Sequence, residues 1–131
     1  MKKAGILNRR LAMTIAAMGH TDLLVVGDAG LPVPTGVPCV DLAVTAGLPA
    51  LLDVVQAIAT ELQVEGVMLA EETRERRDSL ADDLLALFPG AEVMWVSHQA
   101  LKKTSELARA VVRTGETTPY ANIILRSGVT F

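Results

Sequence analysis

Polar side chains that could carry out chemistry gather in three short segments of the sequence. Gly19-His20-Thr21-Asp22 is soon followed by Asp28, Ser97-His98 comes later, and the last segment runs from Arg113 to Asn122. An imidazole titrates near neutral pH, so His20 could both give and take a proton. Opening a sugar hemiacetal needs both events, because O1 loses a proton while the ring oxygen gains one. The alternative is a structural or surface histidine just past a helix.

The other candidates are groups that could hold a polar ligand. Asp28 ends an apolar run and could accept bonds from hydroxyls or orient a histidine, or simply cap the following turn. His98 comes second after a predicted strand and could instead be an ordinary first-turn helix residue. Tyr120 and Asn122 flank Ala121, and an extended segment would place both side chains on one face. Tyr offers a hydroxyl and a flat ring, and Asn offers a donor and an acceptor; the alternative is an ordinary strand entry.

Several other chemistries lack a motif in this sequence. The two histidines have no His-x-x-x-His spacing, and neither glycine-rich phosphate pattern is present. No Ser or Cys nucleophile motif stands out, and the single Cys39 reads as a buried, inert thiol in a strand. We therefore expect no metal and no cofactor.

The elements that must position these residues follow from apolar periodicity and breakers. Strands are predicted near 23–28, 38–42, 66–70, 92–96, 110–113 and 122–126. Helices are predicted near 9–18, from Gly47-Leu48-Pro49 to about 62 with Pro near the first helical position, at 76–87, and from a Ser97 cap to about 107. The alternation predicts a single α/β domain over residues 1–131, with a mostly parallel or mixed central sheet flanked by helices. The last strands lack an intervening helix, which predicts an antiparallel or mixed edge.

Composition narrows the class of protein. The chain has 131 residues, half of them apolar but only 3% aromatic, which is much apolar surface for a small monomer, so we expect a homo-oligomer. The net charge of −3 and the absence of a basic run argue against nucleic-acid binding. The charged run at 71–78 mixes both signs and predicts a solvated helix face or helix start. No signal peptide or membrane span is visible, so we expect a cytoplasmic protein without membrane contact.

Taken together and in order, the motifs resemble the D-ribose pyranase family, which is related to fucose mutarotase. The resemblance runs from Lys3-Ala4-Gly5-Ile6-Leu7-Asn8 to Gly128-Val129-Thr130-Phe131. It passes through Gly19-His20-Thr21-Asp22, Asp28-Ala29-Gly30-Leu31-Pro32-Val33-Pro34, Val112-Arg113-Thr114-Gly115-Glu116 and Thr118-Pro119-Tyr120-Ala121-Asn122. Leu101-Lys102 departs from the family's Phe-Lys pair; Lys102 ranks below the residues named for contact with the sugar.

The resemblance implies interconversion of the β-pyranose and β-furanose forms of D-ribose. It makes His20 the proton donor and assigns substrate contacts to Asp28, His98, Tyr120, Ala121 and Asn122. It also implies a decamer of two stacked pentameric rings with sites between subunits. Two alternatives stay open: a mutarotase for fucose or another sugar, and a non-catalytic sugar-binding or assembly protein in which His20 is structural.

Overall fold

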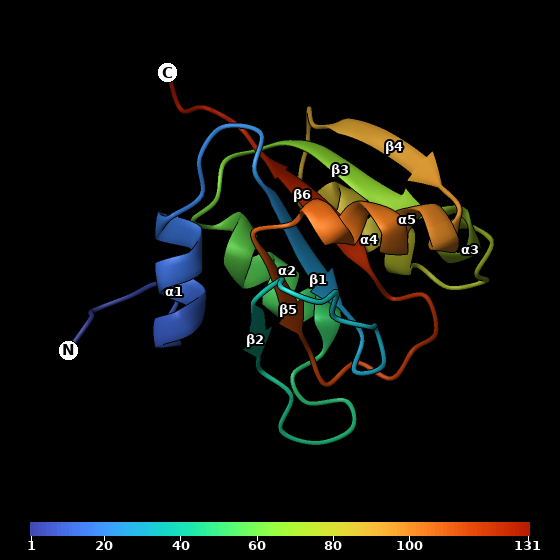
Figure 1. The fold of residues 1–131 in the computed structure, drawn as a ribbon, viewed down its shortest axis with the longest axis horizontal. Helices are drawn as coiled ribbons and strands as arrows, with labels where there is room; N and C mark the ends of the chain where they lie inside the picture. The colour runs from blue at the N-terminus through green and yellow to red at the C-terminus, as the bar shows by residue number, and fades with distance from the viewer.

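A six-stranded mixed sheet runs through the centre of the chain, with helices on both of its faces (Figure 1). The computed structural model describes all 131 residues. In chain order the elements are α1 (Arg9–Ala16), β1 (Leu23–Gly27), β2 (Cys39–Asp41), α2 (Leu51–Ala59), β3 (Val64–Ala70), α3 (Glu71–Arg74), α4 (Leu80–Ala86), β4 (Glu92–Val96), α5 (His98–Thr104), the short 3₁₀ helix η1 (Ser105–Leu107), β5 (Ala110–Arg113) and β6 (Ile123–Ser127). The predicted α/β fold with a mixed sheet flanked by helices is confirmed.

Each face of the sheet carries its own apolar cluster, because successive side chains along a strand point to opposite faces. Leu24 and Val26 of β1 belong to a cluster of 20 buried residues that includes side chains of α1, α2 and α4. Val25 points the other way, into a cluster of 7 with Leu101 of α5. Leu101 is fully buried there. In Figure 1, α5 lies in front of the sheet, and α2 and α4 lie behind it.

The antiparallel strand lies inside the sheet and both edge strands pair parallel, so the expectation of an antiparallel or mixed edge is wrong. The strand order is β2-β5-β1-β6-β3-β4, and β6 is antiparallel to both neighbours, β1 and β3. All the other pairs are parallel. Ile123, Ile124 and Leu125 are each at most 1% exposed. A strand with consecutive apolar residues needs cover on both faces, which a central position supplies.

The second helix begins later than its proline suggests. We predicted Pro49 near the first helical position, but α2 begins at Leu51, and the Leu48–Pro49 peptide bond is cis. Residues 45–49 instead form a turn bound to the loop after β5. The amide of Gly47 donates to the carbonyl of Gly115 (2.6 Å), and the amide of Gly115 donates to the carbonyl of Pro49 (2.9 Å).

The helix predicted over 76–87 is shorter than expected, since α4 covers only Leu80–Ala86, and a separate short helix, α3, precedes it. α3 begins at Glu71, so the charged run is indeed a helix start, and α4 begins only at Leu80. Asp78 separates them, because its carboxylate accepts hydrogen bonds from the side chain of Arg76 and from the amide of Leu80. No helix of the chain has both the length and the apolar character needed to cross a membrane.

Cys39 opens the edge strand β2, as a strand residue, but it is half-buried where we expected a buried thiol. Burial raises the pKa of this thiol, and the neighbouring Asp41 raises it further, while Arg113 acts in the opposite direction. A thiol with a raised pKa is a poor nucleophile at neutral pH. This agrees with the expected inert role.

Candidate active site

Four of the predicted site residues meet at one end of the sheet. Asp28 follows β1, His98 follows β4, and Tyr120 and Asn122 precede β6. Because β6 runs antiparallel to β1 and β3, its start lies beside the ends of the parallel strands. The side-chain oxygen of Asn122 accepts a hydrogen bond of 3.0 Å from the amide of Asp28. The rings of His98 and Tyr120 meet edge to face, with centroids 5.1 Å apart. We call these four residues the binding cluster.

Two buried nitrogen atoms of the binding cluster have no partner within the chain. They are Nδ1 of His98 and Nδ2 of Asn122. Leaving a buried polar group unsatisfied costs about 1–3 kcal/mol. Asp28 does cap its turn, since its Oδ1 accepts from the amide of Gly30 (2.9 Å), and this uses one of its two oxygens. The binding cluster therefore presents donor and acceptor groups suited to a ligand rich in hydroxyls.

The segment from Tyr120 to Asn122 is a turn, so the expected extended geometry is wrong. Tyr120 has left-handed backbone, with φ of 62°, and the amide of Asn122 donates back to its carbonyl (3.0 Å). As a result Tyr120 is 41% exposed, while Asn122 is fully buried. The side chain of Ala121 packs in the larger apolar cluster, which leaves only its backbone to face a ligand.

Helix α3 and the nearby Arg76 hydrogen-bond to the backbone around the binding cluster, which the sequence did not indicate. The carboxylate of Glu72 accepts from the amide of His98 (2.9 Å). The buried hydroxyl of Thr73 donates to the carbonyl of Tyr120 (2.6 Å), and Arg76 donates to the carbonyl of Pro119 (3.0 Å). The one available signal was position, since α3 directly follows a strand whose end faces the site.

Glu116 fixes the loop that leads to Tyr120. Its carboxylate accepts from the amides of Leu51 (3.1 Å), Thr117 (3.2 Å) and Thr118 (3.1 Å). Partial burial acts to raise the pKa of this carboxyl, but the hydrogen bonds from Thr118, Leu51 and Thr117 outweigh burial and lower it. The loop is thereby tied to the first residue of α2.

Gly27 gives the binding cluster its close packing at the end of β1. A Cβ atom at this position would lie 2.9 Å from the side-chain oxygen of Asn122. Any larger residue would push Asn122 away from the amide of Asp28. Glycine is required here because the side chain of Asn122 approaches the backbone closely, and not because of a special backbone angle.

His20 lies at the opposite end of the same strand. It sits in the loop between α1 and β1, whereas Asp28 follows β1, and Figure 1 shows these two loops at opposite ends of the sheet. The five residues of β1 span about 15 Å at the usual rise per residue. Nε2 of His20 lies 3.0 Å from Oε2 of Glu65, and the imidazole is 53% exposed. One chain therefore does not bring His20 to the binding cluster.

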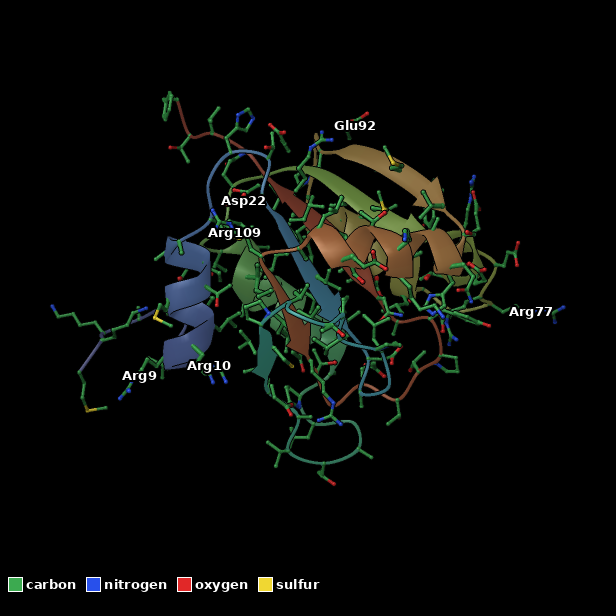
Figure 2. The ribbon with its side chains drawn as sticks, in the orientation of Figure 1. Arg9, Arg10, Asp22, Arg77, Glu92 and Arg109 are labelled. Atoms are coloured by element: carbon green, nitrogen blue, oxygen red, sulfur yellow. The ribbon has the colours of Figure 1, made fainter.

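The loop that carries His20 is held by Asp22. Its Oδ2 accepts from the amide of Gly19 (2.8 Å) and from Nε of Arg109 (2.9 Å). Figure 2 shows Asp22 and Arg109 side by side near the start of β1. The hydrogen bond from Gly19, followed by that from Arg109, lowers the pKa of the Asp22 carboxyl.

Thr21, next to His20, has left-handed backbone with φ of 69°. Thr21 and Tyr120 are the only non-glycine residues of the chain with positive φ.

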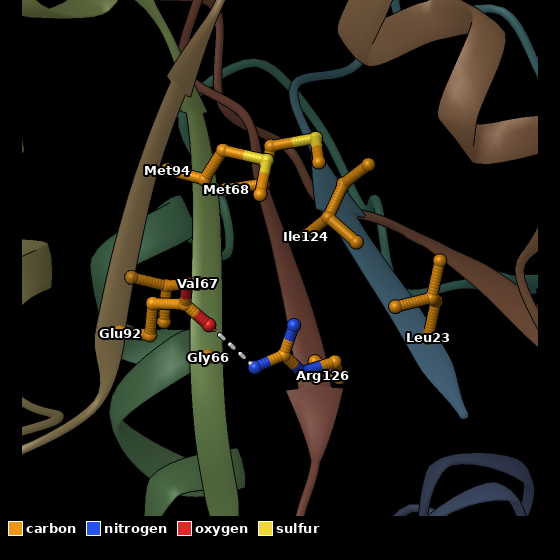
Figure 3. A pocket seen from close by; sticks show the side chains of 8 residues that line it. All are labelled: Leu23, Gly66, Val67, Met68, Glu92, Met94, Ile124 and Arg126. Atoms are coloured by element: carbon orange, nitrogen blue, oxygen red, sulfur yellow. Dashed lines mark hydrogen bonds and ion pairs between the residues drawn. The ribbon is translucent and has the colours of Figure 1, made fainter. Parts of the chain in front are cut away.

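No hollow of the surface is lined by a residue of the binding cluster. The pocket in Figure 3 lies over β1, β3, β4 and β6 and is lined by Leu23, Gly66, Val67, Met68, Glu92, Met94, Ile124 and Arg126. Lys102 lines a separate hollow with Pro32, Pro34 and Ser105. No three His, Cys, Asp or Glu side chains are grouped so that they could hold a metal ion.

Comparison with known proteins assigns this chain to a family. Residues 1–130 match the model of the RbsD / FucU transport protein family. The chain belongs to this family. Its members include a D-ribose pyranase of Symbiobacterium thermophilum, 55% identical over 131 residues and matched along 100% of both chains. A D-ribose pyranase of Chloroflexus aggregans is 50% identical, again over 100% of both chains.

Solved structures of the RbsD / FucU family have the same fold. Bacillus subtilis RbsD, solved in complex with D-ribose, superposes with a TM-score of 0.95 at 48% identity and covers 100% of both chains. The fucose mutarotase of Streptococcus pneumoniae, solved with L-fucose, superposes with a TM-score of 0.78 at 20% identity over 95% of each chain. The second likeness extends to the fold alone.

Proposed function

We propose that residues 1–131 form one sugar-ring isomerase domain, a D-ribose pyranase that interconverts the β-pyranose and β-furanose forms of D-ribose in the cytoplasm. The observation that carries the proposal is the binding cluster, with unpartnered buried nitrogens on His98 and Asn122 beside Asp28 and Tyr120. Support comes from the relatives named D-ribose pyranase at up to 55% identity over the full length. The ribose in the complex of Bacillus subtilis RbsD is a hydroxyl-rich ligand of the kind these groups suit.

Each half of the reaction, ring opening and ring closure, requires two proton transfers. In ring opening, the hydroxyl on C1 loses its proton, the bond from C1 to the ring oxygen breaks, and the ring oxygen gains a proton. In closure, another hydroxyl loses its proton as its oxygen attacks the C1 carbonyl, and the carbonyl oxygen is protonated. We assign this proton transfer to His20 as the catalytic residue. Asp28, His98, Tyr120, Asn122 and the backbone at Ala121 hold the sugar.

The separation of His20 from the binding cluster supports a site built from two copies of the chain. The ring of a pentose is about two C–C bonds wide, or about 3 Å. It cannot bridge the roughly 15 Å of β1 that separate His20 from Asp28. We therefore propose that His20 of one copy faces the binding cluster of a neighbouring copy. Such head-to-tail contacts close into rings, which fits the proposed decamer of two pentameric rings with D-ribose bound between subunits.

Exchange NMR on D-ribose tests the activity. The rate of exchange between the pyranose and furanose signals should rise in proportion to protein concentration. An unchanged rate at saturating protein would overturn the proposal. The same measurement on L-fucose and other free sugars decides between a ribose pyranase and a mutarotase, since the preferred sugar is the one whose exchange is accelerated most.

Mixing two inactive variants tests the shared site. His20→Ala removes the proton-transfer group, and Asp28→Asn removes a charge from the binding cluster while preserving the turn. If the two halves come from different copies, co-assembled variants recover about a quarter of the wild-type rate, since random pairing completes one site in four. If each site is built within one chain, every chain has a defect and no activity returns. Light scattering counts the copies in the assembly.

A further inference from the structure

The carboxylate of Glu65 contacts the imidazole of His20 and is itself held in place by Arg126. Oε2 of Glu65 is 3.0 Å from Nε2 of His20, and Oε1 of the same carboxylate accepts from Nε of Arg126 at 3.0 Å. Arg126 then donates to Glu92 at 2.8 Å, the contact drawn in Figure 3. Each oxygen of Glu65 thus has one partner, so the carboxylate cannot turn without breaking a bond. Nδ1 of His20 makes no hydrogen bond within the chain.

The fold places Glu65 here by an irregularity of the sheet. Val64 pairs with Ser127 and Gly66 pairs with Arg126, so β3 has one more residue than β6 at this point, and that residue is Glu65. A bulge of this kind re-aims a side chain that would otherwise follow the alternation of the strand. A Cβ atom at Gly66 would lie 2.9 Å from the Arg126 guanidinium, so the glycine makes room for the group that holds Glu65.

A carboxylate on one nitrogen of an imidazole determines which nitrogen carries the proton. It accepts a hydrogen bond, so the neutral ring keeps its proton on the nitrogen that faces the carboxylate. The other nitrogen then has a free lone pair. In hydrolases with a Ser-His-Asp arrangement, the buried carboxylate fixes the ring in this way, and losing it lowers the rate because the ring adopts the wrong tautomer.

We infer that Glu65 is a positioning residue for His20, which holds the imidazole with its proton on Nε2 and leaves Nδ1 as the atom that exchanges protons with the sugar. This inference deepens the proposed function and rests on it. Glu65 does not touch the sugar, because it lies on the far side of the ring from the reacting nitrogen. Arg126 acts one step further back, by holding Glu65.

The kinetic test compares two glutamates that both contact Arg126. Glu65→Gln keeps the size of the side chain but loses the charge that fixes the ring. We expect its maximal exchange rate to fall about tenfold, less than the loss expected for removing an acid/base group altogether. The ribose concentration at half-saturation should not change, because Glu65 does not touch the sugar. Glu92→Gln, the matched control, removes the other partner of Arg126 and should retain the wild-type rate.

The result that overturns the inference is a wild-type maximal rate in Glu65→Gln. A purely structural role would instead lower the melting temperature and leave the rate per folded molecule unchanged. The wild-type protein is measured first on D-ribose. If it does not accelerate exchange, the proposed function fails, and the assignment of the tautomer is then decided by a separate experiment.

That experiment is ¹⁵N magic-angle-spinning NMR of protein labelled at histidine. The chain has only two histidines, so the His98→Gln variant assigns the signals. At about pH 9, where an ordinary imidazole is neutral, His20 should show a protonated Nε2 and an unprotonated Nδ1 in the wild type. Glu65→Gln should lose this preference, and Glu92→Gln should keep it. A wild-type His20 protonated on Nδ1 would overturn the inference whatever the activity.

Discussion

The two ends of β1 differ in burial and in the kinds of residues that they carry. At its carboxyl end, the binding cluster is tightly packed, with Asn122 fully buried and bonded to the backbone of Asp28. At its amino end, His20 and its partners form ion pairs near the surface, with the imidazole 53% exposed. At the first end, a few polar groups are set into an apolar frame. The second is a charged rim.

The difference explains why the two ends come from separate chains in the proposed site. A group that holds a sugar must be rigid, and burial supplies rigidity. A group that exchanges protons must keep the freedom to become charged, which full burial opposes. Placing His20 on an exposed rim and letting a neighbouring copy cover the sugar meets both needs.

The largest expected effect comes from removing His20. Substitutions at the two ends of β1 should also differ in which kinetic constant they change. His20→Ala should lower the maximal exchange rate at least about 10²-fold, the usual contribution of an acid/base group. The free energy of unfolding should change by less than about 1 kcal/mol, because the contact of His20 with Glu65 is exposed and such contacts contribute little. His98→Ala should instead raise the half-saturating ribose concentration about tenfold, the loss of one hydrogen bond of about 1.4 kcal/mol.

Both variants are measured by exchange NMR over a range of ribose concentrations, with urea unfolding as the check on stability. If His20→Ala changed only the half-saturating concentration, His20 would belong with the groups that hold the sugar. If His98→Ala abolished the maximal rate, the division between the two ends would be wrong.

Much of the binding cluster was predictable from the sequence, for a physical reason. The apolar run ending at Asp28 and the strand ending before Ser97 indicate parallel strands, and side chains at the carboxyl ends of such strands come together. The cap at Ser97 was also predictable, and its hydroxyl accepts from the amide of Ala100 (3.1 Å). Local patterns sufficed because each of these features depends on a few consecutive residues.

Features that depend on pairing across the sheet were not predictable. The central place of β6 follows from which strands it pairs with, and apolar periodicity is the same for a central and an edge strand. Glu65 is 45 residues from His20, and in the sequence it is an ordinary polar residue just before a predicted strand. Its role arises from a bulge that appears only when β3 and β6 are set in register. The turn at Tyr120 likewise depends on the hydroxyl of Thr73 in α3.

A smaller effect concerns the pH dependence of stability at the binding end. Hydrogen bonds outweigh burial and lower the pKa of Glu116 in the folded chain below its ordinary value of 4.5. Its stabilisation is therefore complete above that value and is lost as the pH falls through the lowered pKa. Glu116→Gln should cost about 1–2 kcal/mol of unfolding free energy at pH 7, for hydrogen bonds to a charged acceptor. The difference in unfolding free energy between Glu116→Gln and the wild type, the gap, should disappear at acidic pH.

Urea unfolding from pH 7 down to pH 2 measures this gap. Asp22→Asn at the other end is the comparison, since the pKa of Asp22 is also lowered and its carboxylate is tied to Gly19 and Arg109. The Asp22 gap should be the smaller of the two at pH 7, because solvent screens an exposed pair. A Glu116 gap that stays constant with pH would show that its hydrogen bonds do not depend on the charge.

The smallest expected effect tests the backbone beside His20. Thr21 has φ of 69°, and left-handed backbone costs a residue with a Cβ atom about 1–2 kcal/mol. Thr21→Gly removes this strain but adds about 0.5–1 kcal/mol of chain entropy to the unfolded state. We expect a net gain of about 0.5 kcal/mol in unfolding free energy, and a modest loss of exchange rate as the loop that carries His20 loosens. Thr21→Ala is the control, because it removes the hydroxyl and keeps the strain. Equal stability of the two variants would mean that the left-handed backbone at this position costs no more than the chain entropy that glycine adds, about 0.5–1 kcal/mol, and that the exposed end of β1 is held under less strain than we expect.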